Sequence, residues 1–267
     1  MSLIPHGEPV RFFTFAGLTA LGLPHVTTTR HCPGVTAWSD AAGPFESEAV
    51  RALAGAGVDL TRAAWARQVH GADVVRVGPN GGFAGSADAL VSTEPGVVLA
   101  IFTADCLAIV LHDTDARVLA VAHVGWRGTV RGAAQAAVTA LVNLGAHPQR
   151  LRAAITPSIG PCCYEVDEAV AAEFRQAYPS VWERWVTPVR PGHWLLDLWR
   201  ANEELLARAG IPAEQIENAR LCTACHTELF YSYRKGNRGR LVTLAALRMN
   251  RVETASGGGS LVPPPIQ

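Results

Sequence analysis

Long apolar stretches with short polar breaks dominate the middle of the chain. Residues 97–113 read VVLAIFTADCLAIVLHD, and residues 117–123 read RVLAVAH. Such runs are typical of central strands that are buried on both faces, because no polar residues alternate with the apolar ones. The pattern predicts a nearly continuous strand over 97–113, interrupted by the segment 103–105, and a second buried strand that ends at His123.

Shorter β-rich runs and helical repeats of apolar residues fill much of the remaining sequence. Runs bounded by Gly and Pro predict further strands, at 10–18, 23–30, 64–70, 73–77, 89–93, 151–156 and the two ends of 220–248. Apolar residues at helical spacing predict helices, at 44–57, 128–145, 167–178 and 193–210. Turn residues fill 78–88, which is predicted to be a loop.

Three of the best soft-metal ligands in the sequence lie at or just past these apolar runs, namely His70, Cys106 and His123. Their separations of 36 and 17 residues are too long for a local zinc knuckle, whereas catalytic zinc takes three protein ligands and keeps one open position. Two imidazoles and a thiolate suit zinc and also copper. A buried free cysteine with two unrelated histidines fits the spacing alone equally well.

The neighbours of these three residues favour a site over a plain core. Asp105 precedes Cys106, and Gln68, Trp126 and Arg127 lie within a few residues of the histidines. Three glycines remove side chains beside the candidate ligands and permit close backbone approach; they are Gly71, Gly125 and Gly128. The helix predicted after these glycines begins with free backbone N–H groups, which can bind an anion.

Composition narrows the classes of partner. The 267 residues suffice for one large domain or two small ones, and 23 basic residues balance 23 acidic ones. A net charge of zero gives no electrostatic footprint for nucleic acid or an anionic membrane. No apolar run approaches the roughly 20 residues that cross a bilayer. The N-terminus has no basic start followed by an apolar region, so we expect a cytoplasmic protein.

The six cysteines do not form the pattern of a disulfide framework, and reduced thiols are expected. His31 and Cys32 precede Pro33 and Gly34 and predict a turn rather than a metal site. Cys162 and Cys163 are expected to pack beneath a loop. The C-x-x-C-H motif at 222–226 matches covalent haem attachment, but no export signal or haem-sized helical domain accompanies it. A C-x-x-C redox pair is the alternative there, although such pairs normally open a helix.

Five motifs in this order, QVHG, TADC, AHVGWRG, IGPCCYEV and CT…FYSYR, resemble the YfiH or laccase-domain family. This family was first named multicopper polyphenol oxidoreductase and is now associated with zinc-dependent purine nucleoside phosphorylase and adenosine deaminase activity. The resemblance covers residues 10–248. It implies one α+β catalytic domain over 1–250, with mixed β-sheets covered by helices as in Cys/His deamidase-like domains. The Gly- and Pro-rich composition of 251–267 predicts a low-complexity tail there.

The resemblance implies that His70, Cys106 and His123 bind the metal and that the substrates are a small nucleoside and phosphate. Zinc makes water a nucleophile near neutral pH, and a carboxylate that is not a ligand moves the proton. Asp105 is the nearest carboxylate in sequence and Glu165 the second. Three arginines are candidates for the phosphate, namely Arg30, Arg127 and Arg234. Further candidates for substrate contacts are Gln68, Trp126, Cys163, Tyr164, Phe230 and Tyr233.

Other functions remain open from the sequence. A copper-dependent polyphenol oxidase fits the older family name, yet multicopper oxidases need about ten histidine ligands, and this chain has 9 histidines in total. A hydrolase or amidase that edits peptidoglycan precursors would use Cys106 as a nucleophile activated by His123. A metal-storage or interaction protein would bind zinc without turnover. We expect a monomer or a homodimer.

Overall fold

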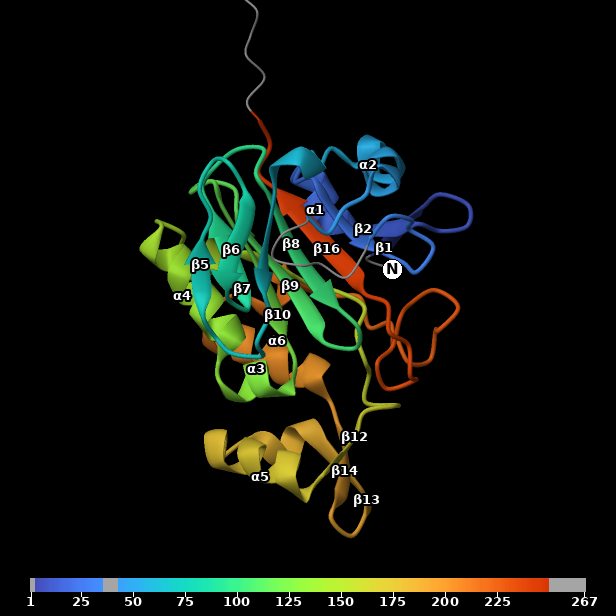
Figure 1. Ribbon diagram of the computed structural model, residues 1–267. Coiled ribbons are helices and arrows are strands. Elements are labelled where there is room, and N and C mark those ends of the chain that lie inside the picture. The colour runs from blue at the N-terminus through green and yellow to red at the C-terminus, as the bar shows by residue number, and fades with distance from the viewer. Residues whose placement is uncertain (1–2, 36–42, 250–267) are drawn as a thin grey trace, which may run out of the picture.

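The computed structural model describes residues 3–35 and 43–249, and two large β-sheets stack face to face in it (Figure 1). One sheet has seven strands, in the spatial order β1 (Leu3–His6), β2 (Phe12–Phe15), β3 (His25–Thr28), β16 (Leu241–Ala246), β8 (Val98–Thr103), β4 (Ala63–Arg67) and β6 (Gly82–Ser86). The other has six, in the order β15 (Ile216–Asn218), β11 (Arg152–Ile155), β9 (Leu107–Asp113), β10 (Val118–Val124), β7 (Ala89–Ser92) and β5 (Val74–Arg76). Both sheets mix parallel and antiparallel pairs, which confirms the predicted fold class.

The central strands β9 and β10 are buried on both faces, as their continuous apolar sequences predict. Side chains alternate along a strand. Leu107 and Ile109 therefore pack on the outer face of the six-stranded sheet, against the helices that cover it. Ala108 and Val110 pack on the inner face, against the seven-stranded sheet. His123 lies two residues after Val121, which packs between the two sheets, so both side chains are on the same face of β10. His123 therefore points into the space between the sheets at one end of β10.

Helices cover the outer faces of both sheets. Apolar faces of α4 (Ala133–Asn143) and α6 (Leu198–Arg208) pack on the six-stranded sheet, and α2 (Ser47–Leu53) packs on the seven-stranded sheet. At one end, α5 (Glu168–Ala177) accompanies a three-stranded sheet of β12 (Glu165–Asp167), β14 (His193–Leu196) and β13 (Val186–Arg190) (Figure 1). The remaining short helices are α1 (Ala16–Ala20), α3 (Trp126–Val130), η1 (Ala54–Ala56), η2 (Leu60–Arg62), η3 (Pro148–Arg150), η4 (Trp182–Trp185) and η5 (Ala213–Gln215).

The prediction of one strand over 97–113 is wrong. The run forms β8 and β9, which belong to different sheets, and the chain turns between them at Ala104–Cys106. Asp105 takes a positive φ of 84° at this turn. A continuous apolar run can be a single strand or two buried strands joined by a tight turn. The hydrophobic pattern therefore did not predict the turn that positions Cys106.

Two further predictions, for segments that contain glycine, are also wrong. The predicted loop over 78–88 contains β6, which pairs in parallel with β4 although glycines usually weaken strands. The predicted helix over 128–145 is two helices, because Gly132 adopts a left-handed φ of 77° between α3 and α4. The first of them already begins at Trp126.

Other predicted elements also differ from the structure in their bounds or their type. The run at 10–18 is a strand only to Phe15 and then turns into α1. The predicted helix over 193–210 starts as β14, and α6 begins after Asp197 caps it through the N–H of Arg200. No strand lies at 220–226 in the described chain, where Cys222 makes an isolated bridge to Ser158.

The predicted tail over 251–267 lies outside the described residues. Within 3–35 and 43–249, no helix combines the length and apolar character that crossing a membrane requires.

Candidate metal and substrate site

The fold brings His70, Cys106 and His123 together, and we call these three residues the triad. One ligand atom from each lies within 4.8 Å of the others. The two imidazole rings meet edge to face, with centroids 4.8 Å apart. His70 follows β4, Cys106 directly precedes β9, and His123 lies in β10. The three segments converge although 36 and 17 residues separate the ligands in sequence.

Unusual backbone conformations place two of these side chains. His70 has a φ of 58°, and Asp105, directly before Cys106, has a φ of 84°. Non-glycine residues in this region carry strain that the surrounding structure must hold, and such strain clusters at functional sites. Hydrogen bonds hold the His70 turn, including one of 2.8 Å from Arg131 Nη1 to the His70 carbonyl oxygen.

Gly125 leaves room for the cysteine of the triad. A Cβ atom at this position would lie 2.8 Å from Cys106 Sγ and 3.5 Å from His70 Cδ2. The close approach, rather than a positive φ, therefore requires glycine here. Gly128 lies one turn along α3, and a Cβ atom there would meet its nearest neighbour at 3.5 Å, an ordinary contact.

A residue that the sequence analysis missed, Asp88, orients the triad. Its fully buried carboxylate accepts a hydrogen bond of 2.8 Å from His123 Nδ1. It also accepts bonds from the backbone N–H groups of Val69, His70 and Gly71, at 3.2, 2.9 and 2.6 Å. One carboxylate thus fixes a ring of the triad and the turn that carries the other ring. An aspartate directly before the buried strand ALVS was the available signal.

Cys106 and His123 form a coupled acid–base pair. Burial opposes ionisation of the thiol, but hydrogen bonds with His123 and His70 outweigh it and lower the pKa of Cys106 to about 6. Burial also disfavours the imidazolium, but hydrogen bonds with Asp88 and Cys106 outweigh it and raise the pKa of His123 to about 9. Near neutral pH the metal-free pair is therefore a thiolate beside an imidazolium.

The donor set fits a catalytic metal ion. Two imidazole nitrogens and one thiolate are ligands that zinc prefers, and three protein ligands leave a coordination position for water or substrate. His70 is exposed while His123 is buried, so the triad is open to solvent on one side. The carboxylate on His123 is the partner that metal-binding histidines commonly have.

Asp105 lies beside the triad but points to another loop. Its buried carboxylate accepts hydrogen bonds from Thr223 Oγ1 at 2.7 Å, from Ser232 Oγ at 3.0 Å and from the backbone N–H of Arg234 at 2.7 Å. Asp105 therefore anchors the loop that follows residue 222. Its role in moving a proton stays a prediction. Glu165, the second carboxylate considered, pairs with Arg190 and His193 in the small sheet.

A group of aromatic and cationic side chains surrounds Tyr164. The guanidinium carbon of Arg234 lies 5.1 Å from the centre of the Tyr164 ring, and that of Arg127 lies 4.2 Å from the ring of Trp126. The pKa of Tyr164 is raised, mainly by burial and then by the negative charge of Cys106. The positive charges of Arg234 and Arg127 oppose this shift but do not cancel it. Tyr164 thus lies within electrostatic reach of Cys106 and of the two arginines.

Other predicted residues make contacts elsewhere. The side-chain amide of Gln68 makes two hydrogen bonds with the backbone of Phe102. Its Nε2 donates to the carbonyl oxygen at 2.7 Å, and its Oε1 accepts from the N–H at 2.8 Å. Arg30 donates to the carbonyl oxygen of Thr227 and lies over the ring of Tyr231. Tyr233 is 74% exposed.

Two further candidates have structural surroundings. Phe230 is fully buried against Phe13, which makes it a core residue. Cys163 places its Sγ atom 3.4 Å from Cys225 Sγ.

A cavity of about 1150 Å³ lies elsewhere in the described residues. His6 and Arg248 are among the residues that line it, and no predicted site residue does so.

Comparison with known proteins adds four findings. The family model described as Multi-copper polyphenol oxidoreductase laccase matches residues 37–248. A purine nucleoside phosphorylase of Deinococcus radiodurans is 39% identical over 247 residues, 88% of this chain and 93% of that protein. Adenosine deaminase RL5, from an unknown prokaryotic organism, is 40% identical over 158 residues, 58% of this chain and 60% of that protein. The crystal structure of YlmD from Geobacillus stearothermophilus matches with a TM-score of 0.81 at 29% identity, covering 92% of this chain and 100% of that one.

Proposed function

The chain belongs to the Multi-copper polyphenol oxidoreductase laccase family, and we propose that it is a zinc-dependent enzyme of purine nucleosides. The proposed reactions are phosphorolysis of adenosine, inosine, guanosine and methylthioadenosine, and deamination of adenosine. The observation that carries the proposal is the compact triad with its buried Asp88. The support from similarity is the 39% identity to a purine nucleoside phosphorylase across 88% of the chain.

His70, Cys106 and His123 hold the zinc ion in this proposal, and Asp88 keeps His123 in the orientation that presents Nε2 to the site. When bound, zinc supplies Lewis acidity that activates water or polarises a substrate oxygen. Copper can occupy the same ligands, because affinities in the divalent series rise toward copper. Only two of the nine histidines belong to the triad, which disfavours a multicopper oxidase.

The substrate is proposed to lie along the exposed side of the triad. Arg127 and Arg234 carry exposed guanidinium groups beside Trp126 and Tyr164, so they can bind phosphate while the aromatic rings stack the purine. Arginine suits phosphate because its planar fork offers paired donors. Arg30 is a further phosphate candidate.

Chromatography of the products tests this function directly. Zinc-loaded protein is incubated with adenosine, with and without phosphate, and the products are separated. Phosphorolysis predicts adenine only when phosphate is present, and deamination predicts inosine in both samples. Arg30→Ala should raise the phosphate requirement more than it affects deamination. Adenosine left intact in both samples would overturn the proposal.

A second candidate function rests on the Cys106–His123 pair. A cysteine whose pKa is lowered to about 6 beside a histidine resembles the nucleophile of Cys-dependent hydrolases. Such an enzyme, including one that edits peptidoglycan precursors, loses activity on alkylation and ignores chelators. The zinc enzyme loses activity with chelators and regains it with zinc.

A further inference from the structure

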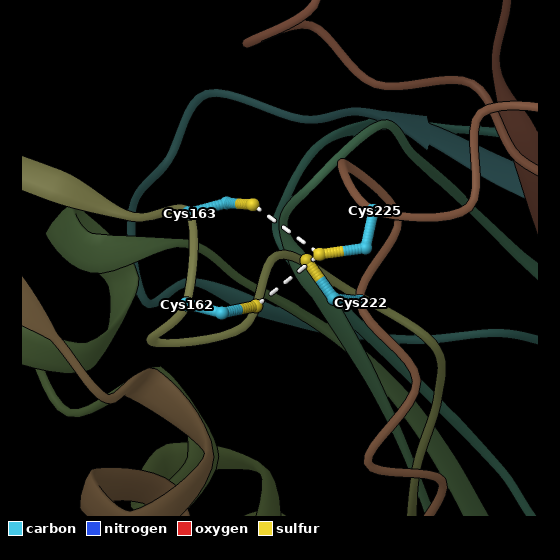
Figure 2. Close-up of side chains that lie close together, drawn as sticks. All are labelled: Cys162, Cys163, Cys222 and Cys225. Atoms are coloured by element: carbon cyan, nitrogen blue, oxygen red, sulfur yellow. Dashed lines mark hydrogen bonds between the residues drawn. The ribbon is translucent and has the colours of Figure 1, made fainter.

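Four cysteines form a second cluster, apart from the triad. Cys162 and Cys163 come from the loop before β12, and Cys222 and Cys225 come from the loop after β15. All four Sγ atoms lie within 4.8 Å of one another. Figure 2 shows the side chains of the two loops pointing toward a common centre, and Sγ of Cys225 lies 3.4 Å from both Cys162 Sγ and Cys163 Sγ.

These distances do not describe disulfides. A disulfide brings its sulfur atoms to about 2.05 Å, and all four thiols are free. Four thiolates at the usual zinc–sulfur distance of about 2.3 Å stand at the corners of a tetrahedron whose edges are about 3.8 Å. The observed contacts of 3.4 Å and the limit of 4.8 Å bracket that edge length.

The sequence spacing also matches a structural ion rather than a catalytic one. The ligands come as two close pairs, C-C at 162–163 and C-x-x-C at 222–225, whereas the triad has long separations. Four protein ligands close the coordination shell and leave no position for substrate. Tetrahedral sites of four sulfurs select zinc or iron over harder ions.

The surroundings support a metal ligand at Cys222 and leave the cluster open to solvent. The backbone N–H of Gly160 donates to Sγ of buried Cys222 at 3.3 Å; bonds of this kind orient and tune metal ligands. Cys162 and Cys225 are exposed, which gives an ion a path of entry.

The cluster joins two loops that both support the predicted substrate site. Tyr164 directly follows Cys163, and Thr223, which bonds Asp105, directly follows Cys222. Elsewhere the loops meet through backbone hydrogen bonds, from Ser158 N to the Leu221 oxygen at 3.2 Å and from Thr223 N to the Ser158 oxygen at 3.1 Å. An ion bound to both loops would fix the separation of Tyr164 and Asp105.

We propose that Cys162, Cys163, Cys222 and Cys225 bind one structural zinc ion that cross-links these two loops. The proposal replaces the expectations of simple packing for Cys162 and Cys163 and of a redox pair for Cys222 and Cys225. It does not depend on which reaction the triad catalyses, because the cluster and the triad share no residue.

The test counts metal per chain in protein purified and reconstituted with zinc under reducing conditions. The His70→Ala variant, whose triad is disabled, should retain about one zinc ion, whereas Cys162→Ser/Cys225→Ser should lose about one relative to wild type. Cys32→Ala is the matched control, because Cys32 is a buried free cysteine outside both groups. It should keep the wild-type zinc content.

Cobalt titration of the wild-type chain gives a readout that needs no variant. A site of four thiolates produces strong sulfur-to-cobalt absorption, and the triad, with a single thiolate, produces far less. Saturation with only the weak single-thiolate signal would overturn the proposal. So would a zinc content in Cys162→Ser/Cys225→Ser equal to that of Cys32→Ala, or a disulfide within the cluster in the mass of the intact native protein.

Discussion

The buried carboxylate of Asp88 receives hydrogen bonds from His123 Nδ1 and from three backbone N–H groups at 69–71. Burial raises the pKa of Asp88, but these bonds outweigh it and hold the pKa below its ordinary value. The side chain therefore remains charged beside His123. A charged partner on the far nitrogen fixes the tautomer of a metal-binding histidine and raises its basicity.

We therefore predict that Asp88→Asn weakens zinc binding by the triad. The expected loss is about 10- to 100-fold, the usual cost of removing a partner that orients a metal ligand. The measurement is the chelator concentration that halves phosphorolysis. Asp113→Asn is the matched control, because Asp113 is an equally buried carboxylate that accepts backbone N–H groups at the far end of β9. Equal chelator sensitivity in both variants would remove Asp88 from this role.

The coupled pair predicts how zinc affinity depends on pH. A pKa of about 9 for His123 means that its imidazolium must lose a proton before it can bind zinc. Apparent affinity should therefore rise about tenfold per pH unit between pH 7 and 9, and level off above that range. Below the pKa of about 6 for Cys106, the thiol must also ionise and the slope becomes steeper.

This pH dependence is measured by equilibrating the protein with a chelator at each pH and then assaying residual activity at one fixed pH. Correction for the chelator's own protonation gives the slope for the protein. A flat affinity between pH 7 and 9 would contradict the imidazolium assignment.

At the scale of elements, the connection between β10 and α3 determines whether the triad closes. Gly125→Ala would place a methyl group 2.8 Å from Cys106 Sγ, so we predict loss of zinc binding and activity. Gly128→Ala, in α3, meets only ordinary contacts and should keep both. The two variants are compared by zinc content and by thermal unfolding, which separates a blocked site from a misfolded chain. Full zinc content in Gly125→Ala would contradict the account.

The elements that deliver the triad were partly predictable from the sequence. The bend at His70 and the end of the buried run at His123 were visible, because Gly71 and Gly125 break the apolar pattern there. The turn at Asp105 was seen only as an interruption, since a positive φ at a non-glycine residue leaves no mark in a hydrophobic pattern. The role of Asp88 was missed because its partners come from 69–71 and 123, far away in the sequence.

At the scale of the molecule, the mixed α+β fold was predictable, but the pairing of its strands was not. Strands β8 and β9 are adjacent in sequence and lie in different sheets, whereas β16 joins β3 to β8 from the end of the described chain. Local patterns carry no information on such long-range pairing. For the same reason the four-cysteine cluster was not predicted, because its two pairs lie about 60 residues apart and meet only through the arrangement of two loops.

The central claim is that one zinc ion on the triad is required for nucleoside turnover. The most direct test measures zinc content and phosphorolysis in the same samples of His70→Ala, His123→Ala and His147→Asn. His147 is an exposed histidine that caps η3, and it serves as the matched control. We predict that each triad variant loses about one zinc ion and its phosphorolysis together, and that His147→Asn keeps both. A triad variant that has lost this zinc and retains full phosphorolysis would contradict the account.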